Sequence, residues 1–148
     1  MRSRFMALSA AIWLVALSCA PMQMYEGNAL PSHEVCVIRA PTSYPHVSLV
    51  AVDGARARAP AEILPGRRIV RAQLSDEDSD GFELKGACNI SVEAVGGTEL
   101  FIRGSFTPPA KRVPGPEGVP GRAARVRLWL EDSDGTRVAN CEEFEMYR

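Results

Sequence analysis

The fold of this chain is limited most by a period-two alternation of apolar and polar residues, repeated in short segments along the sequence. Residues 125–131 read Arg-Val-Arg-Leu-Trp-Leu-Glu, and residues 87–95 alternate in the same way. This period is typical of strands that bury one face. Turn residues such as Asp53-Gly54 separate the segments, and no segment repeats apolar residues at helical spacing over three turns. The pattern therefore predicts an all-β fold.

About seven such segments follow one another after residue 33. We expect them to form a single β-sandwich of short antiparallel strands, because short strands separated by frequent turns are typical of that architecture. Residues 107–122 are rich in proline and glycine and predict a long irregular loop, since proline is excluded from central strands. The expected strands are residues 34–39, 47–52, 67–74, 87–95, 98–106, 125–131 and 136–144.

The first 18 residues have the layout of a leader. Arg2 and Arg4 precede an uncharged apolar run over residues 5–18, and small residues follow it. The run is shorter than the roughly 20 residues that a membrane-spanning helix needs. A buried N-terminal helix is the alternative, but such a helix would show polar residues at helical spacing. We therefore expect residues 1–18 to be a signal peptide that forms a helix.

Two cleavage sites compete at the end of this leader. Ser18 and Ala20 suit ordinary signal peptidase cleavage before Pro21, but proline there fixes the backbone and removes an N–H group. Residues 15–19, Val-Ala-Leu-Ser-Cys, instead resemble the lipobox of bacterial lipoproteins. In that family the cysteine thiol carries diacylglycerol and the cysteine becomes the new N-terminus. We favour this second reading, with Cys19 as the lipidation site.

The lipoprotein reading sets the expected organisation of the chain. It predicts a signal peptide at residues 1–18, the lipidated cysteine and a tether at 19–33, and a β-sandwich domain at 34–148. The residue after the cysteine is Ala20, and the family's sorting rule then implies the outer membrane of a bacterial cell envelope, with the domain facing the periplasm or the cell surface. Removing the leader takes away two of the 17 basic residues and none of the 18 acidic ones, so the net charge falls from −1 to −3. Nucleic acid is not an expected partner, because it calls for a basic face.

Three cysteines remain if Cys19 is lipidated, and an exported protein meets an oxidising compartment that favours one disulfide. Three pairings are possible. We favour Cys88–Cys141, because Cys36 lies inside an apolar run and resembles a small buried hydrophobe. A zinc site is not predicted, because the chain has no CxxC pair and its two histidines lie at no zinc-like spacing.

Several short motifs lie along the chain. They are YEG at 25–27, EVCVI at 34–38, VAVDG at 50–54, ILPGRR at 63–68 and WLED at 129–132 with the following Gly135 and Val138. Together these motifs resemble those of a group of small bacterial lipoproteins of unknown function, and the VDG and LPG motifs also resemble PEGA-type β modules found on envelope proteins. The resemblance implies an envelope location and a β domain, and it implies no reaction.

An acidic stretch is the one candidate metal site. Asp76, Asp78 and Asp80, followed by Gly81, have the D-x-D-x-D-G start of a calcium-binding loop. The twelfth position of a full EF-hand loop, normally glutamate, is Ala87 here. The alternative is a solvated acidic turn, and the second DSDG at residues 132–135 favours turn chemistry. Calcium therefore remains the weaker reading.

A local group of arginines is the candidate anion-binding surface. It could meet lipid phosphates or an anionic glycan, although a solvated sheet edge is the simpler interpretation. Trp129 is expected to be half-buried in packing on the sheet. The arginines are Arg56, Arg58, Arg67, Arg68 and Arg71.

The sequence contains no GxSxG, HExxH or phosphate-binding loop. We therefore expect a non-enzymatic envelope lipoprotein with a structural or interaction role and no cofactor. Its expected partners are the membrane, reached through the lipid, and an envelope protein or glycan. The alternative is a soluble secreted or periplasmic binding domain, with calcium-dependent binding as one form of it.

Overall fold

The computed structural model describes residues 20–77, 83–107, 112–114, 120–141 and 144–147. In this part of the chain the only helix is the short 3₁₀ turn η1 (Ser32–Glu34), and the rest is strand, turn and loop. The predicted all-β class is therefore confirmed. The expected signal helix and Cys19 lie outside the described residues.

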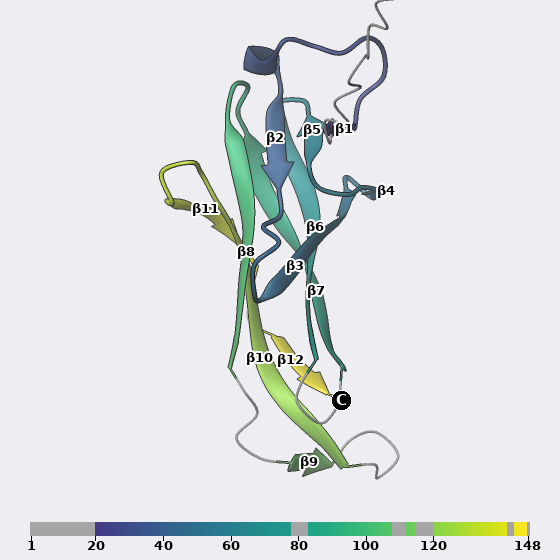
Figure 1. The fold of residues 1–148 in the computed structure, drawn as a ribbon, viewed down its shortest axis with the longest axis vertical. Coiled ribbons are helices and arrows are strands. Elements are labelled where there is room, and N and C mark those ends of the chain that lie inside the picture. The colour runs from purple at the N-terminus through teal and green to yellow at the C-terminus, as the bar shows by residue number, and fades with distance from the viewer. Residues whose placement is uncertain (1–19, 78–82, 108–111, 115–119, 142–143, 148) are drawn as a thin grey trace, which may run out of the picture.

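Eight strands form the larger sheet, which runs along the long axis of the molecule (Figure 1). Its main path ends at β1 on one edge and at β11 on the other, and β9 and β12 both pair with β10. In sheet order the strands are β1 (Met22–Gln23), β5 (Ala61–Ile63), β2 (Cys36–Arg39), β8 (Glu99–Thr107), β10 (Pro120–Glu131) and β11 (Arg137–Asn140), with β9 (Arg112–Pro114) and β12 (Phe144–Tyr147) beside β10.

Four strands form the smaller sheet, in the order β4 (Ala55–Arg56), β3 (His46–Val52), β6 (Gly66–Glu77) and β7 (Glu83–Ala94). The β6–β7 hairpin is long, and its register runs without a break from Gly66 opposite Ala94 to Glu77 opposite Glu83. Strand β3 contains a bulge between Leu49 and Ala51 in its pairing with β6. The bulge lies a few residues before the turn that leads from β3 into β4.

The two sheets pack face to face around one apolar core. The buried residues alternate along each long strand, as the period-two pattern predicts, and no polar or charged residue of the described chain is buried. The fully buried side chains include Ile38, Ile63, Val70, Leu74, Ile90, Ile102, Val126, Leu128 and Leu130.

Gly104 allows the sheets to approach closely at the middle of β8. A Cβ atom at this position would lie 2.8 Å from Leu74 Cδ1 and 2.9 Å from Val47 Cγ1, both on the facing sheet. Carbon atoms do not approach so closely without displacing one another. A side chain at this position would therefore push the two sheets apart.

A disulfide links Cys88 of β7 to Cys141, the residue that follows β11, with 6.2 Å between their Cα atoms. The predicted pairing is therefore confirmed. Cys36 is fully buried, as predicted, and it forms no disulfide among the described residues. Because β7 and β11 are edge strands of opposite sheets, the bond joins the two sheets along one side of the molecule.

The prediction of seven antiparallel strands was wrong in number and in pairing. Twelve strands are described, and two pairs, β1 with β5 and β2 with β8, are parallel. Five strands were not predicted, because two to four residues are too few to display a clear alternation. They are β1, β4, β5, β9 and β12. The proline-rich segment 107–122, predicted as a loop, contains β9 and the start of β10.

Part of the segment predicted as a tether is bound to the domain. The Met22 N–H donates to the Pro60 carbonyl over 2.7 Å, and the Met24 N–H donates to the Glu62 carbonyl over 3.0 Å. The Tyr25 hydroxyl lies 3.1 Å from Glu62 Oε2 and also accepts the Leu30 N–H. These hydrogen bonds pair the backbone of residues 22–24 with β5 and the residue before it. The folded domain therefore includes the chain from Met22 onward.

Candidate functional site

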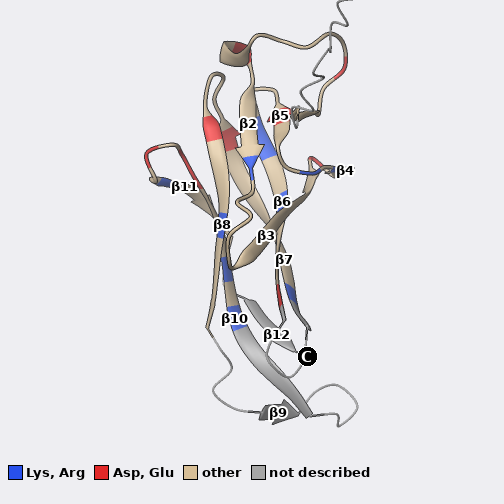
Figure 2. Ribbon diagram, viewed as in Figure 1, with Lys and Arg blue, Asp and Glu red and all other residues tan. Residues whose placement is uncertain are grey.

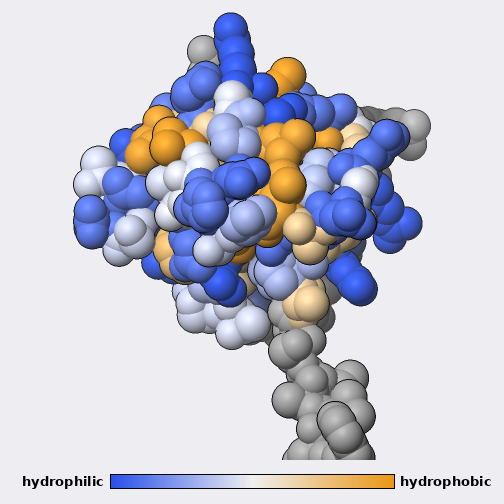
Figure 3. All heavy atoms as spheres, turned by 90° about the horizontal axis from the view of Figure 1, so that it is seen from above, coloured by the Kyte–Doolittle hydropathy of each residue, from blue (hydrophilic) through white to orange (hydrophobic). Residues whose placement is uncertain are grey.

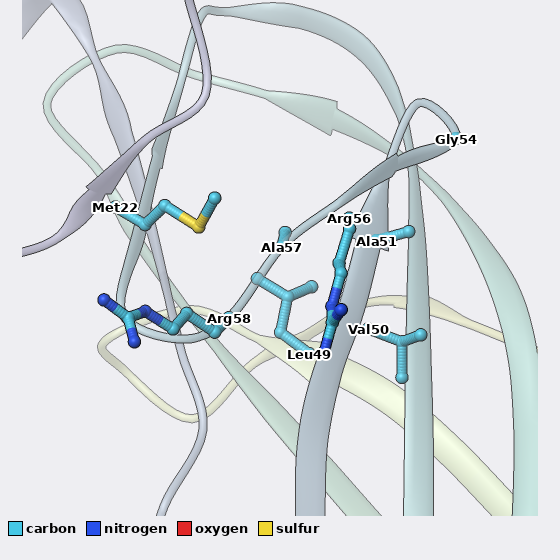
Figure 4. Close-up of a pocket in the computed structure, with 8 residues that line it drawn as sticks. All are labelled: Met22, Leu49, Val50, Ala51, Gly54, Arg56, Ala57 and Arg58. Carbon is cyan, nitrogen blue, oxygen red and sulfur yellow. The ribbon is translucent and has the colours of Figure 1, made fainter.

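A groove of about 840 Å³ lies between the edges of the two sheets, on the side that is not joined by the disulfide. One wall is β1 of the larger sheet, and the other is β3 and β4 of the smaller sheet (Figure 4). The groove falls within the volume range of sites that bind small molecules or peptide side chains. Its lining residues are Met22, Leu49, Val50, Ala51, Gly54, Arg56, Ala57 and Arg58.

The tight turn between β3 and β4 shapes one end of the groove. Asp53 has a positive φ of 49° and Gly54 one of 83°, which aspartate and glycine tolerate better than other residues. Asp53 Oδ1 accepts the Ile69 N–H over 2.8 Å, and Asp53 Oδ2 lies 3.0 Å from Arg68 Nη1. This aspartate therefore fixes the turn onto β6.

Arg68 extends the same contact to the β5–β6 turn. Its guanidinium donates to the Leu64 and Pro65 carbonyls over 3.0 and 3.1 Å. Asp53 and Arg68 are 15 residues apart in the sequence, and their pairing brings the VDG turn and the LPG turn into one hydrogen-bonded cluster. We call this set of residues, Asp53, Arg68 and the carbonyls of Leu64 and Pro65, the turn clasp.

The floor of the groove is the segment that crosses from one sheet to the other. The Ala57 N–H donates to the Val50 carbonyl over 2.9 Å, and Ala57 is buried. The chain then passes through Pro60 into β5 of the larger sheet. Because β1 pairs in parallel with β5, this crossing also positions Met22 on the opposite wall.

Two arginines line the groove without a partner of their own. Arg56 and Arg58 are exposed, and neither forms an ion pair or hydrogen bond within the described part of the chain. Figure 4 shows the Arg58 side chain on the Met22 side of the groove and the Arg56 side chain on the β3 side. The groove therefore combines apolar walls with two unneutralised positive charges.

The five arginines of the predicted cluster do not form one patch. Arg68 is in the turn clasp, and Arg67 Nε lies 3.3 Å from Ser91 Oγ on β7. Only Arg56 and Arg58 line the groove. Figure 2 shows the basic and acidic residues distributed over both sheets. Arg56 and Arg58 belong to β4 and the segment after it, whereas the other three arginines are on β6. Within β6, alternation along the strand places Arg67 and Arg68 on opposite faces.

The acidic stretch is described only in part. Asp76 lies on β6, and its Oδ2 accepts a hydrogen bond from the Tyr44 hydroxyl over 3.3 Å. Tyr44 is largely exposed, but partial desolvation of its hydroxyl, followed by the nearby Asp76 carboxylate, raises the pKa of Tyr44 above its ordinary value. Asp78 and Asp80 lie outside the described residues. Among residues that the structure does describe, no group of three or more potential metal ligands was found.

Trp129 is half-buried on the outer face of the larger sheet, where both its indole N–H and its ring face have a partner. Its indole N–H donates to Glu131 Oε1 over 2.7 Å, and the Arg137 guanidinium lies 4.3 Å from its ring centroid. Arg103 Nε lies 3.1 Å from Glu131 Oε2. The Trp129 hydrogen bond and the neighbouring arginines lower the pKa of Glu131 against the opposing effect of burial. This cluster is a packing arrangement, as expected for Trp129.

Large exposed apolar residues are scattered on the described surface. They are Tyr44, Leu64, Ile69, Val95 and Val138. On the end of the molecule seen in Figure 3, apolar patches are small and separated by hydrophilic side chains. Single exposed apolar residues are usual for soluble domains and do not mark a site.

The groove itself was not predicted from the sequence. Arg56 and Arg58 were named as part of a basic cluster, but the apolar partners Met22, Leu49 and Val50 were not. The crossing of the chain between sheets brings them together, and no local pattern reveals it. Pro60 lies in this crossing and was the only residue of it that marked a break in the strand pattern.

Comparison with known proteins found no matching family model, curated protein or solved structure. Within the described residues, no helix is long and apolar enough to span a membrane.

Proposed function

We propose that this protein is a lipoprotein of the bacterial cell envelope, anchored through lipidated Cys19, and that its β domain is a non-enzymatic binding module. The observation that carries the proposal is the groove at the N-terminal edge of the domain. It has apolar walls, two unpaired guanidinium groups and an adjacent strand edge, which suit the binding of another molecule.

The position of the groove suits an anchored protein. Met22 lines the groove and follows Cys19 by three residues. An extended chain spans at most about 3.6 Å per residue, so a lipid on Cys19 would hold the groove within roughly 11 Å of the anchor point. The tether is thus short, and the groove would face material close to the membrane surface.

The disulfide supports export of the chain. Disulfides form and persist in oxidising compartments such as the periplasm and cell surface, and they are rare in the cytosol. The Cys88–Cys141 bond joins the two sheets on the side opposite the groove. A disulfide that joins the two sheets would hold the two walls of the groove in a fixed relation outside the cell.

The anchor is tested by intact-mass measurement of the protein from native membranes beside a Cys19→Ala variant. We expect a chain that starts at Cys19 and carries diacylglycerol and acyl mass, and we expect the variant to lose that mass and leave the membrane fraction. Cys36→Ala is the matched control and should remain lipidated. An unmodified wild-type chain that starts at Pro21 would contradict the anchor and leave a secreted domain.

The binding role is tested separately, by photo-crosslinking in living cells. A photoreactive residue replaces Val50 in the groove or, as the control, Val138 on β11. We expect discrete crosslinked products from position 50 alone. Products of equal yield from both positions, or none from either, would contradict a binding function at the groove.

A further inference from the structure

We propose that the groove binds an extended acidic segment of a partner protein, which adds as a further strand along the free edge of β3. This inference rests on the proposed function as a binding module and names the chemistry of its ligand. The inference follows from two features of the groove, its apolar walls and its unneutralised arginines, and from an unpaired strand edge that adjoins the groove at Leu49.

The first feature is the edge of β3. On the side away from β6, β3 pairs only with β4, through Ala51 and Val52, and Val50 accepts one bond from Ala57. Residues 46–49 therefore have no strand partner on that side within the described chain. An unpaired edge of four residues, about 13 Å long, presents backbone donors and acceptors that an extended peptide can satisfy.

The second feature is the apolar character of the walls. Leu49, Val50 and Ala51 lie at the edge strand, and Met22 lies across the groove from them. Side chains of an added strand alternate between two faces. Those on the inner face would fill the space beside Met22 and Ala57, so every second residue of the ligand should be apolar.

The third feature is charge. Arg56 and Arg58 line the groove without acidic partners, and no acidic residue is among the described residues that line it. Carboxylates on the outer face of an added strand could pair with these guanidinium groups. The remaining positions of the ligand should therefore be aspartate or glutamate.

The same arginines argue against two other occupants. Edge-to-edge pairing of two copies of this chain would bring the arginines of both copies together, and charged edge residues oppose such pairing. A membrane surface offers phosphates but no backbone groups, so it would leave the β3 edge and the apolar walls unused. An acidic peptide uses all three features.

The experiment measures the binding of labelled eight-residue peptides to the full chain by fluorescence anisotropy. One peptide alternates valine and glutamate, and its controls replace glutamate with glutamine or methylate every second backbone nitrogen. We expect the glutamate peptide to bind at least roughly tenfold more tightly than the glutamine peptide, and added salt to weaken it. N-methylation should abolish binding, because it removes the donors that pair with β3.

The protein variants are Arg56→Gln and Arg58→Gln, with Arg67→Gln as the matched control on β6. We expect each groove variant to weaken the glutamate peptide roughly two- to fivefold, which is the range of exposed ion pairs, and the double variant roughly tenfold. Arg67→Gln should leave binding unchanged. All four arginine-to-glutamine proteins should melt at the wild-type temperature, because the replaced side chains are exposed.

Several results would overturn the inference. These are equal binding of the glutamate and glutamine peptides, undiminished binding of the N-methylated peptide, or binding of anionic lipid vesicles through Arg56 and Arg58 with no peptide binding. An undiminished yield of crosslinked products from position 50 in the double arginine variant would reject the acidic ligand and leave the binding-module function standing. Loss of all crosslinked products in wild-type cells would instead count against that function itself.

Discussion

At the scale of single residues, Asp53 does more for the fold than its exposed position suggests. Its carboxylate accepts the Ile69 N–H and pairs with Arg68, while its own backbone takes the positive φ that the β3–β4 turn needs. Because Asp53 both accepts these hydrogen bonds and adopts a positive φ, it holds the residues of the turn clasp together. The clasp in turn fixes Gly54 and Arg56 at the groove.

Asp53→Ala should therefore destabilise the domain by about 1–3 kcal/mol. The variant leaves the Ile69 N–H and the Arg68 guanidinium without this acceptor and places alanine at positive φ. Urea denaturation measures the change in the free energy of unfolding. Asp53→Asn is the control, because asparagine tolerates this backbone and can still accept the Ile69 N–H, and it should cost less. Equal stability of Asp53→Ala and wild type would contradict the role of the clasp.

Glu131 predicts how the stability depends on pH. The hydrogen bond from Trp129, together with Arg103 and Arg137, lowers its pKa in the folded state below the ordinary value of 4.5. The unfolded chain therefore takes up the proton first as the pH falls, so this stabilisation is present above about pH 5 and is lost at lower pH. Its loss should be complete once the pH lies below the folded-state pKa.

Glu131→Gln should flatten the acid side of the stability profile. Glutamine can still accept the Trp129 N–H but carries no charge for Arg103. Melting temperatures measured from about pH 6 down to pH 3 should fall less steeply in this variant than in the wild type. Glu93→Gln, at an exposed site on β7, is the control and should keep the wild-type slope. Parallel profiles for all three proteins would refute the assignment.

At the scale of strands, the sequence predicted the long elements better than the short ones. Strands β6, β7, β8 and β10 each bury one face, so their alternation is visible in the sequence. Strands β1, β4 and β5 have two or three residues and exist because neighbouring backbone groups pair with them. For β1 and β5 this pairing joins segments far apart in the sequence, whereas β4 pairs locally with β3 across the Asp53-Gly54 turn. A single-sequence pattern contains no trace of the long-range pairing.

The groove escaped prediction for the same reason. Turn chemistry identified Asp53-Gly54, and composition identified Arg56 and Arg58 as basic. Met22 reaches the same site because the N-terminal segment pairs with β5. In this pairing Met22 lies opposite Ala61, which is 39 residues later in the sequence. The disulfide could be predicted, because only three cysteines follow Cys19 and one of them, Cys36, lies inside an apolar run. That left Cys88 and Cys141 as the favoured pair.

Gly104 tests the packing of β8 against the smaller sheet. Gly104→Ala would place a Cβ atom 2.8 Å from Leu74 and 2.9 Å from Val47. Overpacking of this kind costs about 1–3 kcal/mol, which denaturant unfolding would measure. The neighbouring exposed residue provides the control, Ser105→Ala, with an expected change below about 0.5 kcal/mol. Adding Val47→Ala to Gly104→Ala should recover part of the loss if the clash is the cause.

At the scale of the whole molecule, the two sides of the β domain differ. The disulfide joins the edge strand β7 to the residue after β11 on one side, and the groove separates β1 from β3 on the other. Closing one side covalently lets the groove side remain open without loss of the fold. In the proposed function, stability and binding would therefore depend on opposite sides of one core.

Reduction should lower the melting temperature, and the effect should depend on one cysteine pair alone. The bond closes a loop with a sequence separation of 53 residues, for which chain entropy gives about 4 kcal/mol of stabilisation. A domain of this size should then melt roughly 10–20 °C lower after reduction. Scanning calorimetry with and without a reductant measures the shift.

The variants separate this bond from the packing of the third thiol. Cys36→Ala removes one buried sulfur and should lose a little stability, but its melting temperature should still fall on reduction as the wild type does. The double variant Cys88→Ala/Cys141→Ala should start at the lower temperature and not respond to the reductant. A reductant effect that persisted in the double variant would place the stabilising bond elsewhere. The disulfide would then no longer explain how the groove side can stay open.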